Sequence, residues 1–76
     1  MIMKEVKIEM RAFPTFLQFR PLGTGHSPEV WKIVTGREQP PFDWSGCCCN
    51  IEAVTATIER ITTELQEIGF TPVFIP

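Results

Sequence analysis

Three consecutive cysteines, Cys47, Cys48 and Cys49, are the residues of this chain most suited to chemistry. They stand directly before a predicted helix, whose dipole and free N–H groups favour a thiolate at that end. With His26, the only histidine, they provide three sulfurs and one imidazole, which is numerically a zinc ligand set. Structural zinc sites, however, separate their cysteines so that two thiolates converge on one ion, and no second cysteine pair completes a site here. A thiol-dependent redox protein, or one that binds a soft metal ion such as copper or zinc, therefore remains an alternative.

No arrangement of residues in the chain is typical of an enzyme. A Cys–His nucleophile pair would need the fold to bring His26 to the cysteines, and a third group to orient it. The segment 23–28 begins like a dinucleotide-binding fingerprint, but Pro28 stands where the third glycine belongs, and no P-loop occurs. We therefore expect a non-enzymatic protein without a cofactor.

The segment 37–49 is predicted to be a loop, because it lacks a hydrophobic period and contains Pro40, Pro41 and Gly46. Connections in compact domains are usually about 4–6 residues long, so a loop of this length suggests a function. A proline pair stiffens the chain, and Phe and Trp are residue types that anchor protein interfaces. The expected partner-binding residues of the 40–44 loop are Pro41, Phe42, Asp43 and Trp44. The alternative is that the two aromatic side chains fold back as a lid on the core.

The charge pattern disfavours a nucleic-acid-binding protein, because the formal net charge is −2. Basic residues predominate before Glu38 and acidic residues after it. The two halves either neutralise each other or form two different faces, and the sequence leaves both open. A third hypothesis is binding of single-stranded nucleic acid, since Phe13, Phe16 and Phe19 recur every three residues beside Arg11 and Arg20 and could stack unpaired bases.

Two strands are predicted near the N-terminus. Polarity alternates over residues 3–13, where Val6, Ile8 and Met10 face one side and charged residues the other. Pro14 ends this strand, and the segment 16–22 is predicted to return as the second strand of a hairpin.

The segment 28–35 fits two structures. Ser27 and Pro28 are typical of a helix start and Gly36 of a helix end. The β-branched residues between them favour a strand. We favour a third strand, because it would give the following helix a broader sheet to cover.

An amphipathic helix over residues 51–68 is the clearest predicted element. Its apolar residues recur at spacings of three and four, with Asn50 as N-cap and Gly69 as the stop. They are Ile51, Val54, Ile58, Ile61, Leu65 and Ile68. The stripe is too short for a coiled coil, so we expect it to cover a sheet, with a homodimer seam as the alternative. Its acidic side, with Glu52, Glu59 and Gln66, is a second candidate contact surface.

The pattern predicts a single α+β domain over residues 1–76. We expect a two-layer sandwich in which one helix covers an antiparallel sheet of three to four strands, in the order β-β-β-α-β, the last strand spanning 70–75. No apolar run reaches the roughly 20 residues of a membrane span, and consecutive cysteines are no disulfide framework, so we expect a cytoplasmic protein. The expected function is binding of a protein partner, as a subunit, adaptor or inhibitor of a larger complex.

Overall fold

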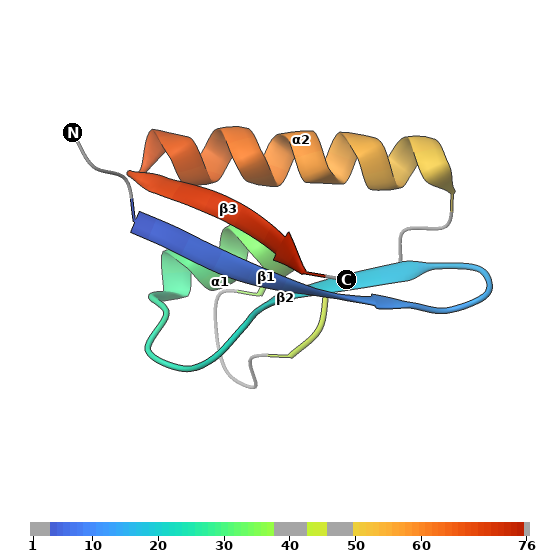
Figure 1. Cartoon of the computed structure of the whole chain (residues 1–76), viewed down its shortest axis with the longest axis horizontal. Coiled ribbons are helices and arrows are strands. Elements are labelled where there is room, and N and C mark those ends of the chain that lie inside the picture. Colours follow the sequence, from blue (N-terminus) through green and yellow to red (C-terminus); the bar gives the residue numbers. More distant parts are fainter. Residues whose placement is uncertain (1–3, 38–42, 46–49, 76) are drawn as a thin grey trace.

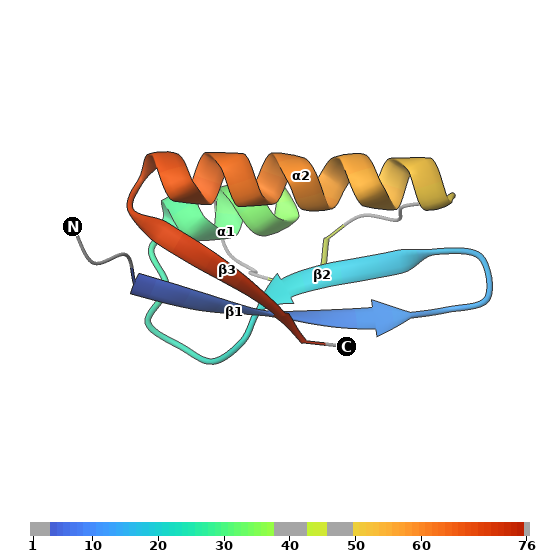
Figure 2. The same cartoon turned by 45° about the horizontal axis from the view of Figure 1, so that its top comes forward.

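The structure is a helix-on-sheet sandwich. The computed structural model describes residues 4–37, 43–45 and 50–75, with the exception of the Ile51 side chain. The chain forms β1 (Lys4–Ala12), β2 (Leu17–Pro21), α1 (Pro28–Thr35), α2 (Ile51–Glu67) and β3 (Phe70–Ile75). Both helices lie on the same side of one sheet, α1 over β2 and α2 over β3 (Figures 1 and 2). The predicted α+β class is confirmed, with three strands in the described part of the chain.

The sheet is mixed, so the prediction of a purely antiparallel sheet is wrong. Its order is β2-β1-β3, with β1 in the centre. The β1–β2 pair is the predicted antiparallel hairpin, in which Met10 lies opposite Phe19. β3 runs parallel to β1, with Ile8 opposite Phe74. Because β3 pairs only with Lys4 to Glu9, the hairpin projects beyond it (Figure 1).

The predicted strand at 28–35 is α1, so the expectation of a third strand there and of a single helix is wrong. The side chain of Ser27 caps the helix by accepting a hydrogen bond from the Val30 N–H, and Pro28 occupies its first turn. Gly36 ends it with a φ of 83°, which a glycine adopts without a steric penalty. Val30, Ile33 and Val34 are buried on one side at helical spacing. Capping and burial here outweigh the strand preference of β-branched residues.

α2 confirms the predicted helix to within one residue. Asn50 is the N-cap, and its side-chain oxygen accepts a hydrogen bond from the Ala53 N–H at 2.7 Å. Gly69 follows with a φ of 88°, as expected of a stop. Ile61 and Leu65, from the predicted stripe, are fully buried. Among the described residues, no helix is both long and apolar enough to cross a membrane.

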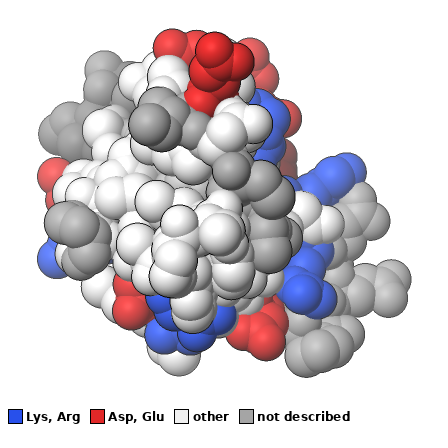
Figure 3. All heavy atoms as spheres, turned by 90° about the vertical axis from the view of Figure 1, so that its right-hand side faces the viewer, with Lys and Arg blue, Asp and Glu red and all other residues white. Residues whose placement is uncertain are grey.

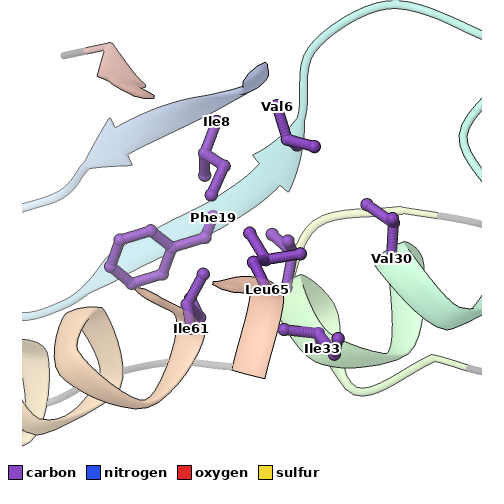
Figure 4. Packing of buried hydrophobic residues seen from close by; sticks show 8 residues of the cluster. Val6, Ile8, Phe19, Val30, Ile33, Ile61 and Leu65 are labelled. Carbon is purple, nitrogen blue, oxygen red and sulfur yellow. The ribbon is translucent and has the colours of Figure 1, made fainter. Parts of the chain in front are cut away.

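One hydrophobic core joins the sheet to both helices. Val6 and Ile8 from β1 and Phe19 from β2 point toward the helices, where they meet side chains from α1 and α2 (Figure 4). The edge of Phe19 also meets the ring of Phe74, with centroids 6.2 Å apart. The buried residues are Val6, Ile8, Phe19, Val30, Ile33, Val34, Ile61 and Leu65. The alternating residues of β1 therefore face the side that the sequence predicts.

Each outer strand carries a proline. In the antiparallel pair of β1 and β2, the Leu22 N–H donates a hydrogen bond to the Lys7 carbonyl. Hydrogen-bonded and non-hydrogen-bonded pairs alternate along such strands, so the backbone groups of Phe19 and Pro21 face away from β1. On the other side, the bond from the Lys4 N–H to the Gly69 carbonyl places the nitrogen of Pro72 on the outer edge of β3. Both prolines thus stand where no hydrogen bond to β1 is lost.

Candidate binding surface at the hairpin end

No described helix covers the second face of the sheet, and polar residues of the hairpin occupy it. Cross-strand neighbours share a face, so Glu9 lies beside Arg20, and Arg11 beside Gln18. Arg20 Nε donates to Glu9 Oε2 at 2.9 Å, and Arg11 donates to the side-chain oxygen of Gln18. Two guanidinium groups therefore lie next to each other on this open face.

The segment 43–45 is attached to the outer edge of β2. The Ser45 N–H donates to the Phe19 carbonyl at 2.9 Å, and the Phe19 N–H donates to Ser45 Oγ at 2.8 Å. Gln18 adds a side-chain hydrogen bond to the Ser45 carbonyl at 3.0 Å. Ser45 is buried, and these bonds satisfy backbone groups that an edge strand would otherwise expose.

Trp44 is held among arginines by this attachment. The Cζ atoms of Arg11 and Arg20 lie 4.2 Å and 4.3 Å from its ring centroid, within range of cation–π attraction. Arg37 Nε donates to the Trp44 carbonyl at 3.3 Å, and Asp43 Oδ1 accepts from the Trp44 N–H at 2.8 Å. The indole is half-buried, so part of it remains accessible.

Two phenylalanines stack at the hairpin turn. The rings of Phe13 and Phe16 have centroids 4.4 Å apart and an interplanar angle of 20°. Phe13 is 39% exposed, and the Cζ atom of Arg11 lies 5.0 Å from its ring centroid. Arg11 thus connects the phenylalanine pair to Trp44. We call Arg11, Phe13, Phe16 and Trp44 the hairpin-end surface; Figure 3 faces this end of the molecule, where uncharged atoms fill the centre of the view.

The structure describes two of the four predicted partner-binding residues. Asp43 is exposed, and Trp44 packs against Arg11 and Arg20 on the open face. Trp44 therefore does not cover the core, which lies on the other side of the sheet. Pro41 and Phe42 lie outside the described residues, and their role stays a prediction. Phe13 and Phe16 were predicted only as residues that could stack unpaired bases, and not as neighbours of Trp44, although their separation by Pro14 and Thr15 is a signal for a hairpin turn.

Of the alternative metal ligands, His26 alone lies among the described residues. His26 Nε2 lies 2.7 Å from the Leu22 carbonyl, within its own loop. This loop, between β2 and α1, lies at the opposite end of the molecule from the first turn of α2 (Figures 1 and 2). Cys47, Cys48 and Cys49 lie outside the described residues, so the thiol and metal hypotheses stay untested. Within the described ranges, no cluster of three or more His, Cys, Asp or Glu side chains could hold a metal ion.

Among the described residues, the helices and the strands carry net charges of opposite sign. Acidic residues outnumber basic ones on the helices, and basic residues outnumber acidic ones on the strands. The helices carry Glu29, Glu52, Glu59, Glu64 and Glu67 against Lys32 and Arg60, and the strands carry Lys4, Lys7, Arg11 and Arg20 against Glu5 and Glu9. Figure 3 shows acidic atoms gathered at the top, where α2 runs, and basic atoms lower down beside further acidic ones.

Comparison of the chain with protein-family models, with curated proteins and with solved structures gives no significant match.

Proposed function

We propose that this protein is a small non-enzymatic protein-binding domain, acting as a subunit, adaptor or inhibitor of a larger complex, and that its partner contacts the hairpin-end surface. The stacked pair of Phe13 and Phe16 carries this proposal. It places apolar rings at a projecting, partly exposed end of the fold, next to a tryptophan and two arginines.

The residue types of the surface support binding of a protein. Aromatic residues and arginine are enriched at the centres of protein interfaces and dominate their binding energy. Rings that are already stacked lose little conformational freedom when a partner covers them. The domain is also small enough that docking onto a larger protein would supplement its own core.

A photo-crosslinking amino acid tests the position of the contact. We would introduce it in place of Thr15, which is exposed at the hairpin turn, and separately in place of Thr63, which is exposed on α2. In cells that naturally contain this protein, the chain with the crosslinker at position 15 should form a discrete crosslinked product with a partner protein. The chain with the crosslinker at position 63 should form little of that product. Substitution of both Phe13 and Phe16 by alanine should remove the product.

The matched control is Leu22→Ala, because Leu22 is 41% exposed and lies outside the hairpin-end surface. This variant should crosslink like the parent protein. Circular dichroism of each variant checks that the fold is intact, and Phe13→Ala alone replaces the double variant if that one unfolds. Equal crosslinking from positions 15 and 63, or a species that survives loss of the phenylalanines, would contradict the proposal.

A further inference from the structure

Arg11 is oriented by contacts on several sides. Its guanidinium lies near the rings of Phe13 and Trp44, and it donates a hydrogen bond to the side chain of Gln18. These partners come from the hairpin turn, from β2 and from the segment 43–45. An arginine held in this way has already lost much of the conformational freedom that binding a ligand would otherwise remove.

The charge of Arg11 has no carboxylate partner among the described residues, whereas the neighbouring Arg20 pairs with Glu9 at 2.9 Å. Arg20 lies near the same indole ring, but Glu9 balances its charge, so Arg11 provides the unpaired positive charge at this place. A guanidinium has five N–H donors in a planar fork, and Gln18 accepts from only one of its nitrogen atoms in the structure. The geometry thus leaves donors that suit a carboxylate, which arginine binds with two parallel hydrogen bonds.

We propose that Arg11 binds a carboxylate of an acidic peptide segment of the partner, whose neighbouring apolar side chain packs on Phe13 and Phe16. The inference rests on the proposed function, and it adds the chemistry of the partner. A peptide with an acidic residue next to an apolar one would place its carboxylate at the Arg11 guanidinium and its apolar side chain on the adjacent rings of Phe13 and Phe16.

The alternation of charge along β1 favours a carboxylate over a nucleic-acid backbone. On the open face, Glu5, Lys7, Glu9 and Arg11 follow one another, so the sign changes at every step. A chain of phosphates that followed this strand would meet two carboxylates as well as two cations. A single carboxylate placed at Arg11 avoids that repulsion.

A random peptide-display library provides the test, because selection from it requires no identified partner. The immobilised chain serves as bait, and selection is compared between the parent protein, Arg11→Gln and Arg60→Gln. Arg60 is the matched control, because it is an exposed arginine on α2 whose ion pair with Glu64 lies outside the hairpin-end surface. Sequences selected by the parent protein and by Arg60→Gln should be enriched in Asp or Glu beside an apolar residue, and Arg11→Gln should lose that enrichment.

Synthetic versions of the selected peptides give the magnitude by fluorescence anisotropy. Arg11→Gln should weaken their binding about tenfold or more, which corresponds to about 1.4 kcal/mol. Arg11→Lys should also weaken it, because an ammonium group cannot form the bidentate contact. Replacement of the peptide's Asp or Glu by Asn or Gln should cause a similar loss, and that loss should largely disappear in Arg11→Gln.

Three results would overturn the inference, and they separate it from the proposed function. Selected peptides that lack acidic residues but depend on Phe13 would leave the protein-binding function standing and remove the role of Arg11. No enrichment over a Phe13→Ala, Phe16→Ala bait would count against both. Tighter, Arg11-dependent binding of a single-stranded poly(dT) oligonucleotide would assign the surface to nucleic acid instead.

Discussion

Ser45 and Phe19 exchange two hydrogen bonds across the outer edge of β2, one from the Ser45 N–H to the Phe19 carbonyl and one from the Phe19 N–H to Ser45 Oγ. The backbone of Phe19 carries a fully buried ring, so its polar groups lie close to the core. The same contact positions Trp44, the residue before Ser45, above the open face of the sheet. The stability of the fold and the position of Trp44 in the hairpin-end surface therefore depend on one short segment.

Ser45→Ala should lower the free energy of unfolding by about 1–3 kcal/mol, because it leaves the Phe19 N–H without its hydroxyl acceptor. Urea unfolding followed by circular dichroism measures the change. Thr63→Ala removes a hydroxyl from the exposed side of α2 and should change stability by no more than about 0.5 kcal/mol. Equal effects of the two substitutions would show that the Ser45 hydroxyl does not stabilise the fold.

Leu65→Ala should destabilise the protein by about 2–5 kcal/mol, because Leu65 is fully buried between α2 and the sheet. In so small a domain this loss should lower the thermal midpoint strongly or abolish cooperative unfolding. The same substitution at Leu22, which is 41% exposed, should have a small effect. Differential scanning calorimetry of the pair provides the comparison, and similar midpoints for both variants would contradict the described core.

Asn50→Ala should cost about 1 kcal/mol, because the Asn50 side chain accepts the hydrogen bond of the Ala53 N–H. Asn50→Asp keeps an acceptor and adds a negative charge at the helix N-terminus, so its stability should equal or exceed that of the parent protein. Chemical unfolding of the two variants gives their order. A more stable alanine variant would be evidence against the cap.

Substitutions at Gly69 should rank by how well each residue tolerates a positive φ. Its φ is 88°, and a Cβ atom built there meets nothing within 4 Å, so the cost arises from the backbone alone. Stability should fall least for Gly69→Asn, more for Gly69→Ala and most for Gly69→Val, since asparagine visits this region and β-branched residues avoid it. Urea midpoints measure the series. A valine variant as stable as the asparagine variant would exclude backbone strain as the cause.

Much of the fold could be predicted because short-range sequence patterns and capping residues determine the helix α2 and the strand β1. The isoleucines and Leu65 of α2 recur at helical spacing, Asn50 and Gly69 mark its ends, and alternation along β1 assigns the buried side. The segment 28–35 could not be assigned with the same rules, because its β-branched residues favour a strand and its caps favour a helix. That misassignment also affected the sheet: with no strand at 28–35, β3 pairs directly with β1 and lies parallel to it.

The hairpin-end surface was only partly predictable. Tryptophan is a residue type that is enriched at protein interfaces, and the sequence alone shows that position 44 carries one. Its position between Arg11 and Arg20 depends on contacts between distant segments, such as that between Phe19 and Ser45, which are 26 positions apart in the chain. Phe13 and Phe16 likewise become neighbours only when the hairpin turn brings them together.

The prolines at the two sheet edges have a consequence for how this protein behaves at high concentration. Unpaired strands act as templates on which further chains add and grow into fibrils. Here Pro72 removes one donor from the edge of β3, and Pro21 together with Ser45 interrupts the edge of β2. The chain thus presents aromatic rings at the hairpin turn while the edges of its sheet offer fewer backbone donors to a further strand.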